Sequence, residues 1–188
     1  THHAHADRGE GFCVFNDFAV AGLKLIENKR VEKILIIDLD VHQGNGNSSL
    51  LKDCDNFFIL SFHGKNNYPY KKIPSHLDIE LEDGTDDDEY LNLLSAALER
   101  ISWENFDILF YQAGVDTLKD DFLGNLNLTH QGLLKRDELV FSFAKKAQLP
   151  VAMALGGGYS RPIEKTITAH VNTYKKAKKI FNEEDDVQ

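Results

Sequence analysis

The sequence predicts an α/β fold with three layers, in which a mostly parallel central sheet lies between two layers of helices. Short apolar runs rich in β-formers alternate along the chain with longer segments of helical periodicity. Strands that are separated by helices form parallel sheets covered on both faces. The length of 188 residues fits one domain with a sizeable core.

Five segments are expected to form the sheet. Lys33 to Asp40 (KILIIDLD) is a nearly continuous apolar run, which is typical of a strand buried on both faces. Leu77 to Leu81 alternates apolar and polar residues, which indicates a short strand or an edge strand. The other expected strands are Phe57 to Phe62, Ile108 to Gln112 and Val151 to Leu155.

Helices are expected over about Asp17 to Asn28, Asp88 to Ile101, Thr129 to Ala147 and Pro162 to Phe181. Asp86 or Asp87 is expected to cap the second of them and Thr129 the third. An oxygen-bearing side chain at a helix start accepts hydrogen bonds from free N–H groups, and a carboxylate there also favours the positive end of the helix dipole.

The composition excludes several classes of protein. No apolar run reaches the roughly 20 residues that span a bilayer, so no membrane association is expected. The net charge of −9 argues against nucleic-acid binding and suits cationic substrates or partners. The two cysteines, Cys13 and Cys54, are too few for a disulfide scaffold or a cysteine metal site, and we expect both to be small buried hydrophobic side chains.

Polar residues follow three of the predicted strands, at the edge where open parallel sheets bind ligands. Asp38, Asp40 and His42 alternate with Leu39 and Val41, so the three polar side chains can share one face. Carboxylates leaving a buried strand are costly unless a cation neutralises them. The alternative is an exposed strand end with solvated acids.

The second segment, ILFYQAGVD, ends at Asp116. Asp40, His42 and Asp116 would give three protein ligands and leave positions for water and substrate, which is typical of a catalytic zinc site, although iron or another divalent metal would also fit. By itself, Asp116 would cap a helix more often than bind a metal.

The third segment is Gly156-Gly157-Gly158-Tyr159. Its glycines allow close approach of the backbone to a ligand, and no GK[ST] follows, so it is not a P-loop. Tyr159 could donate a hydrogen bond or simply pack. Near the start of the chain, His2 and His3 could act as general base and acid if their other ring nitrogens are held, although surface loops and tags also carry histidines.

Four motifs, THHAHADRGEGFCVFND, DLDVHQGNG, AGVD and LGGGY, occur in the order and approximate spacing of histone deacetylases and related amidohydrolases. The chain resembles this family up to about Phe181, and HQGNG, YQAGVD and LGGGYS are most similar to its class IV and bacterial class IV-like branch. The resemblance implies an arginase-like fold and a zinc-dependent hydrolase that acts on an acylated lysine or an acylated small amine in a bacterial cytoplasm.

The resemblance also implies roles for individual residues. Asp40, His42 and Asp116 would ligate zinc, His2 and His3 would flank the attacking water, and Tyr159 would stabilise the tetrahedral intermediate. Gly11, Phe12 and Gly157 would bind substrate, with Tyr68 as an opposite wall. Asp38 would orient His2 and, with the Ser61 hydroxyl and main-chain oxygens of Asp40, His42 and Phe62, hold potassium or sodium. Asn45 lies behind His3, where many relatives have an aspartate.

The family also implies further residues upstream, because its members place about a hundred residues before the paired histidines. We therefore expect an N-terminally truncated catalytic domain over residues 1–182 and an exposed acidic tail over residues 183–188. Three alternatives stay open: an acylpolyamine amidohydrolase, a metal-containing binding protein without turnover, and a dinuclear arginase-like hydrolase. The last is disfavoured because DLDVH lacks a carboxylate to bridge a second metal. The sequence leaves the oligomeric state open.

Overall fold

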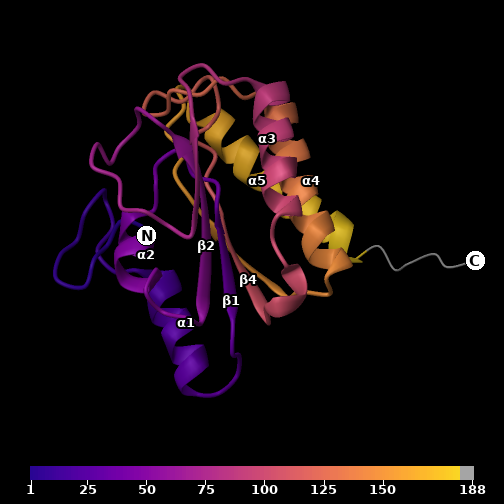
Figure 1. Cartoon of the computed structure of the whole chain (residues 1–188). Coiled ribbons are helices and arrows are strands. Elements are labelled where there is room, and N and C mark those ends of the chain that lie inside the picture. The colour runs from indigo at the N-terminus through magenta and orange to yellow at the C-terminus, as the bar shows by residue number, and fades with distance from the viewer. Residues whose placement is uncertain (183–188) are drawn as a thin grey trace, which may run out of the picture.

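The computed structural model describes residues 1–182, so the predicted acidic tail at 183–188 lies outside the described residues. Five parallel strands form one sheet in the order β3-β2-β1-β4-β5 (Figure 1). Their bounds are β1 (Ile34–Asp38), β2 (Phe57–Gly64), β3 (Leu77–Leu81), β4 (Ile108–Ala113) and β5 (Val151–Leu155). The predicted α/β class with a parallel sheet is confirmed, and β3 lies at an edge of the described sheet as expected.

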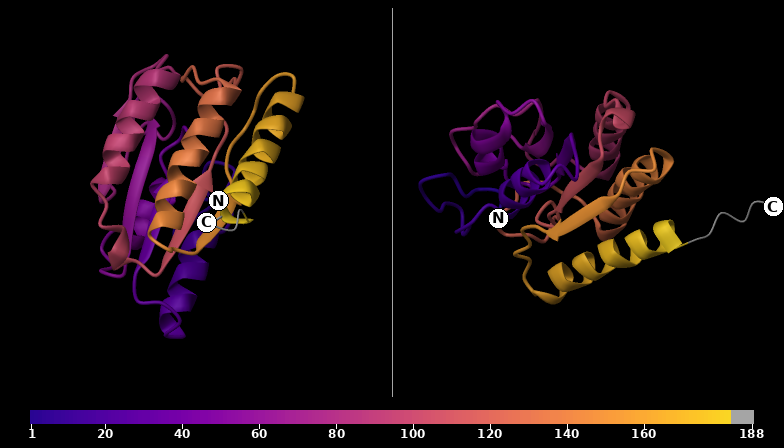
Figure 2. Two further views of the ribbon diagram at one scale, coloured as in Figure 1. Left: turned by 90° about the vertical axis from the view of Figure 1, so that its right-hand side faces the viewer. Right: turned by 90° about the horizontal axis from the view of Figure 1, so that it is seen from below.

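Helices cover both faces of the sheet. On one face lie α1 (Asp17–Glu27) and α2 (Asn45–Leu51). On the other lie α3 (Asp87–Glu99), α4 (His130–Lys146) and α5 (Glu164–Asn182), which stand side by side (Figure 2). A single 3-10 turn, Trp103–Asn105, precedes β4. The three-layer arrangement is therefore the one that the alternation of strand and helix patterns predicts.

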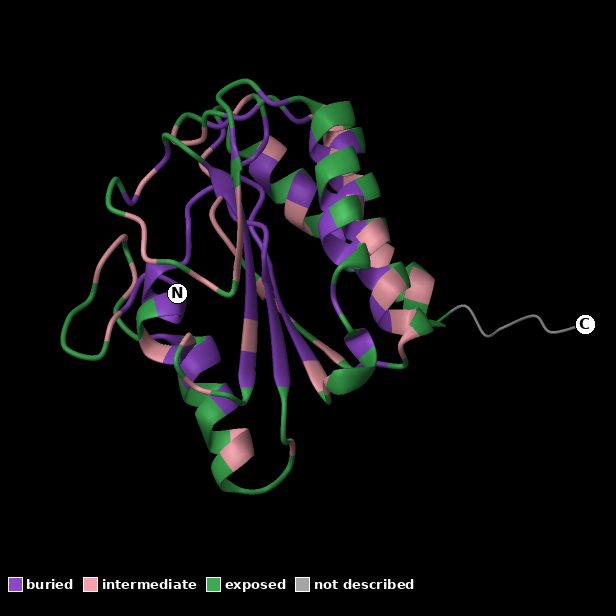
Figure 3. Ribbon diagram, viewed as in Figure 1, coloured by how far each residue is buried: buried purple, intermediate pink, exposed green. Residues whose placement is uncertain are grey.

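The central strand β1 separates two apolar cores. Leu35 and Ile37 pack towards α3, α4 and α5, whereas Ile34 and Ile36 pack towards α1 and α2. All five residues of β1 are buried, as Figure 3 shows for the middle of the sheet. This burial on both faces explains why the sequence of β1 is apolar almost throughout.

Strand β1 ends at Asp38, two residues before the predicted end. Leu39 N still donates to the carbonyl of Gln112 on β4 at 3.1 Å, but the N–H groups that follow donate to carboxylates: Asp40 N to Asp38 Oδ1 at 3.2 Å, Val41 N to Asp116 Oδ1 at 2.9 Å and His42 N to Asp40 Oδ1 at 3.0 Å. The ladder stops because the polar side chains that follow the strand take over its hydrogen bonds.

Helix α2 was not predicted from the sequence. Its segment NGNSSLL has no apolar periodicity, and it buries polar side chains, including Asn45, Asn47 and Ser48. Distant residues bind part of this polar face: Asn47 Oδ1 accepts from Asn16 Nδ2 at 2.8 Å, and Ser48 shares a hydrogen bond with Ser75, whereas Asn47 Nδ2 is buried without a hydrogen-bond partner among the described residues. Local pattern could not reveal a helix whose buried face is polar.

The predicted helix caps are confirmed. Asp86 accepts from Glu89 N, and Thr129 accepts from Gly132 N. The neighbouring carboxylate of Asp87 accepts from both the main-chain N and the hydroxyl of Thr129, so the starts of α3 and α4 are joined. Helix α5 begins at Glu164, two residues after the expected Pro162.

Candidate metal centre and active site

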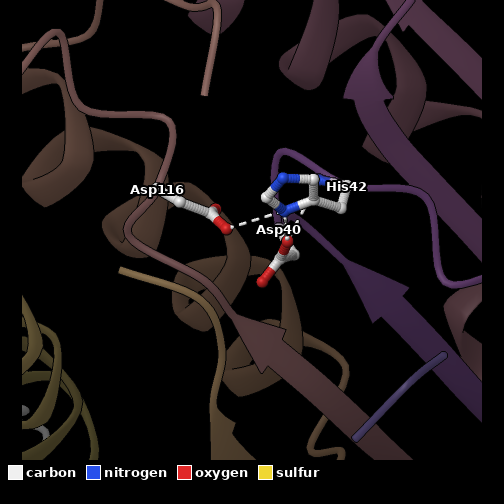
Figure 4. Close-up of side chains that lie close together, drawn as sticks. All are labelled: Asp40, His42 and Asp116. Atoms are coloured by element: carbon white, nitrogen blue, oxygen red, sulfur yellow. Dashed lines mark hydrogen bonds and ion pairs between the residues drawn. The ribbon is translucent and has the colours of Figure 1, made fainter. Parts of the chain in front are cut away.

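Asp40, His42 and Asp116 converge at the carboxyl ends of β1 and β4 (Figure 4). His42 Nδ1 lies 3.0 Å from Asp40 Oδ1 and 3.0 Å from Asp116 Oδ2. One potential ligand atom from each residue lies within 4.8 Å of the other two. The two strands are adjacent and parallel, which brings together residues that are 74 positions apart in the chain.

The loop after β5 completes the support of these carboxylates. Gly157 N donates to Asp40 Oδ2 at 2.6 Å, and its carbonyl accepts from Val115 N. A Cβ on Gly157 would lie 1.9 Å from Asp116 Oδ2, so only glycine lets the chain pass so close. The structure thus places Gly157 against the carboxylates of the candidate metal centre.

The electrostatics of this cluster favour a cation. Burial opposes ionisation of Asp40, but His2 and His42 hold the pKa of its carboxyl well below its usual range. Burial, then the neighbouring Asp40, raise the pKa of Asp116 to about 7. Although burial opposes protonation of His42, the two carboxylates raise its pKa to about 10. One imidazole nitrogen and two carboxylate oxygens, buried and strongly attracting positive charge, fit a divalent ion such as zinc.

His2 and His3 lie beside this cluster in different electrostatic surroundings. His2 Nδ1 is paired with Asp38 Oδ2 at 2.7 Å, and its Nε2 lies 3.8 Å from Asp40 Oδ1. Burial opposes protonation of His2, but Asp38 and Asp40 raise its pKa. Asp38 itself is buried, and burial raises its pKa. His2 is therefore the histidine of the pair that attracts a proton.

His3 is the opposite case. Its Nδ1 lies 2.8 Å from Asn45 Oδ1, at the start of α2. Burial, together with the neighbouring His2, lowers the pKa of His3 to about 3. The rings of the two histidines lie 4.1 Å apart between centroids. The arrangement holds a neutral imidazole, His3, next to one whose pKa is raised, His2, at the edge of the acidic cluster.

The polar cluster opens into a cavity of about 590 Å³. Its lining includes His3, Phe12, Tyr68 and Tyr159, so the structure brings these predicted site residues together. The Tyr68 ring lies 5.0 Å from His3, and the Phe12 ring 6.1 Å from Tyr159. The cavity therefore has aromatic walls and a polar floor.

A tight hairpin presents Phe12 at the mouth of this cavity. Glu10 and Cys13 exchange both of their main-chain hydrogen bonds, and Gly11 and Phe12 between them have positive φ angles of 51° and 64°. Two positive φ angles are what a two-residue hairpin turn of type I′ requires. A Cβ on Gly11 would lie 2.3 Å from His3 Cδ2, so glycine also lets the hairpin pack on the histidine. Phe12 is 88% exposed.

The residues expected to hold a monovalent cation also lie together. Asp38 on β1 and Ser61 on β2 are partners in the parallel register, and Phe62 follows on the same strand. All three are buried. The Ser61 hydroxyl shares a hydrogen bond with His63 Nδ1 at 2.9 Å.

Sequence reasoning missed two residues of the site. Glu10 contacts Tyr68 and Asn45, and nothing in ADRGEGF marked it as more than a surface acid. Arg136 on α4 is fully buried and donates to the carbonyl of Gly114. A signal for Arg136 was present, because it falls on the buried stripe that also carries Leu133, Val140 and Ala144.

The chain resembles known proteins over most of its length. The family model for the histone deacetylase domain matches residues 1–174. An uncharacterized protein of Picosynechococcus is 41% identical over 182 residues, which cover 96% of this chain and 61% of that protein. Histone deacetylase 2 of Arabidopsis thaliana is 37% identical over 88% of this chain and 44% of its own length. The chain thus spans about half the length of these relatives.

Two solved structures are similar in fold. An HDAC homolog from Aquifex aeolicus superposes with a TM-score of 0.75 at 28% identity, covering 98% of this chain and 55% of that one. Acetylpolyamine aminohydrolase from Burkholderia pseudomallei superposes with a TM-score of 0.80 at 22% identity, covering 95% of this chain and 54% of that one. Across residues 1–182, no helix is long and apolar enough to cross a membrane.

Proposed function

The chain belongs to the histone deacetylase family, and we propose that it forms the catalytic part of a zinc-dependent hydrolase that removes an acyl group from an acylated lysine or a similar amine. The convergence of Asp40, His42 and Asp116 beside the neutral His3, at the floor of an open cavity, carries the proposal. These three residues would hold zinc, which would supply the Lewis acidity that polarises an amide carbonyl and acidifies water.

The two histidines divide the proton transfers. His3 is neutral, so in this scheme it takes a proton from the attacking water and later delivers a proton to the leaving amine. His2 is held by Asp38, and its positive charge stabilises the negative charge that develops nearby. A proton that stays on His2 cannot compete for the role of His3 as base.

Tyr159 is proposed to donate a hydrogen bond to the oxyanion of the tetrahedral intermediate. It lines the cavity next to Gly157, and burial, then Asp40 and Asp116, raise the pKa of its phenol. The phenol therefore keeps its proton and remains a donor throughout the reaction.

The cavity suits a linear acylated amine. Phe12 and Tyr68 supply aromatic walls for an aliphatic chain, and the net charge of −9 favours a cationic substrate. An acylated lysine and an acylated polyamine share these features, so both belong in the assay. We place this reaction in a bacterial cytoplasm.

Asp38 is proposed to have a second task, as a ligand of a potassium or sodium ion. The Ser61 hydroxyl and the main-chain oxygens of Asp40, His42 and Phe62 would complete the set. The pairing of Asp38 with Ser61 on adjacent strands and the burial of all these residues support this role. Such an ion would stabilise the loop that carries two zinc ligands.

The proposal is tested by measuring amide hydrolysis. The protein is produced together with whatever sequence its gene encodes before Thr1, loaded with zinc, and assayed with acetyl-lysine peptides, long-chain acyl-lysine peptides and acylpolyamines. Turnover that is lost on chelation and restored by zinc supports the hydrolase. Zinc binding without turnover of any of these substrates supports a metal-containing binding protein instead.

A further inference from the structure

The side-chain amide of Asn45 lies between an imidazole, at its oxygen, and a carboxylate, at its nitrogen. On one side, Asn45 Oδ1 lies 2.8 Å from Nδ1 of His3. On the other side, Asn45 Nδ2 donates to Glu10 Oε1 at 3.3 Å and also lies 3.3 Å from His5 Nε2, a ring nitrogen that can either donate or accept. Asn45 is 3% exposed, so water does not offer its amide an alternative set of partners.

An amide alone does not decide which nitrogen of a neighbouring imidazole carries the proton. Its oxygen accepts and its nitrogen donates, and a half-turn about the last side-chain bond exchanges the two. With the oxygen towards His3, His3 must donate from Nδ1–H. With the nitrogen towards His3, Nδ1 must be the acceptor and the proton moves to Nε2. A residue that fixes the amide therefore fixes the imidazole.

Glu10 supplies that constraint because an ionised carboxylate only accepts. The hydroxyl of Tyr68 donates to Glu10 Oε1 at 2.6 Å, while His5 Nε2 and Arg8 Nε lie 3.0 Å and 3.2 Å from Oε2. The hydrogen bond from Tyr68, opposed by burial, and then that from Asn45 lower the pKa of Glu10. The hairpin to Cys13 fixes the main chain of the same residue.

We propose that Glu10 is a positioning residue that holds the Asn45 amide with its nitrogen outward, and thereby keeps the proton of His3 on Nδ1 and the lone pair on Nε2. This extends the proposed function, because Nε2 is then the atom of His3 that is free to accept a proton from water. The tautomer itself does not depend on turnover, so it is measured separately.

The first test is NMR of protein with ¹⁵N-labelled histidine, in which a His3→Gln spectrum identifies the His3 signals. Wild-type His3 is expected to carry its proton on Nδ1 alone. In Glu10→Gln, which keeps the shape but can donate as well as accept, a second population with the proton on Nε2 is expected. Asp7→Asn is the matched control, since it removes one charge from the same loop at a side chain that is 78% exposed.

A double substitution separates positioning from general damage to the loop. The carboxylate introduced by Asn45→Asp can only accept, so it holds His3 Nδ1–H whatever residue 10 is. The Glu10→Gln/Asn45→Asp protein is therefore expected to return to a single Nδ1–H tautomer. If His3 keeps the Nδ1–H form alone in Glu10→Gln, or if wild-type His3 carries its proton on Nε2, the inference is wrong.

Kinetics give the second readout once a substrate is known. Glu10→Gln is expected to lower kcat in proportion to the fraction of His3 in the wrong tautomer, about twofold for equal populations, with KM unchanged. Asp7→Asn leaves kcat unchanged. If no substrate turns over, the hydrolase proposal fails while the NMR result still decides the role of Glu10.

Discussion

Arg136 Nη1 donates to the main-chain carbonyl of Gly114 at 2.5 Å. Arg136 belongs to α4, and its side chain is fully buried. The same nitrogen lies 3.5 Å from the carbonyl of Leu39. Leu39 and Gly114 precede the candidate ligands Asp40 and Asp116 in the loops that follow the adjacent strands β1 and β4. The guanidinium of Arg136 on α4 therefore joins the two loops that carry these candidate ligands.

Replacing Arg136 by methionine is expected to destabilise the protein by about 3–5 kcal/mol, because it leaves the buried Asp137 without its cation. Urea unfolding measures the loss. Lys135→Met is the control, at an exposed neighbouring position. Arg136→Met/Asp137→Leu removes both charges and should recover part of the stability; equal stability of Arg136→Met and Lys135→Met would contradict the assignment.

Asp116→Asn is expected to weaken zinc binding by more than roughly 100-fold, since even residues that only support a ligand contribute 10–100-fold. The carboxamide keeps an oxygen for Val41 N, so the loop should stay folded. Competition with a chromophoric chelator gives the affinity. Asp120→Asn is the control, because Asp120 pairs with Lys165 and lies outside the metal group; a similar affinity in both variants would argue against Asp116 as a ligand.

Tyr159→Phe is expected to lower kcat by ~10²–10³, the usual effect of removing one preorganised donor to an oxyanion. Its zinc content and unfolding midpoint should stay at the wild-type values. The hydrogen bond that joins Tyr159 to Asp121 is made by the main-chain N–H, which phenylalanine keeps. Tyr174→Phe removes the same atom from an exposed position on α5 and serves as the control. Full activity of Tyr159→Phe would remove the phenol from the mechanism.

Asn45→Asp is expected to raise the pKa of His3 from its value of about 3, because a carboxylate behind Nδ1 favours the imidazolium. A base with a higher pKa loses its free lone pair at a higher pH. The acidic limb of the pH dependence of kcat/KM should therefore move upward in pH. A limb at the same pH in both proteins would show that residue 45 does not set the basicity of His3.

The local sequence was sufficient for most of the fold. The apolar runs of β1, β2 and β4 are visible because these strands are buried on both faces of the sheet, and β5 is apolar although it is only partly buried at an edge of the described sheet. Asp86 and Thr129 mark helix starts through their own side-chain oxygens. Helix α2 escaped because its buried face is polar, so its stability comes from Asn16 and Ser75, far away in the chain.

The sequence by itself also determined which residues could form the metal site, because Asp40, His42 and Asp116 follow two strand patterns with chemistry that a buried strand end does not tolerate unneutralised. Only the tertiary structure decided what surrounds them. Whether Gly157 passes close to Asp40, whether Arg136 reaches Gly114 and whether Glu10 faces Asn45 depend on how loops and helices from separate parts of the chain pack at one edge of the sheet. Such contacts join positions tens of residues apart, and neither periodicity nor spacing along the chain encodes the distance between them.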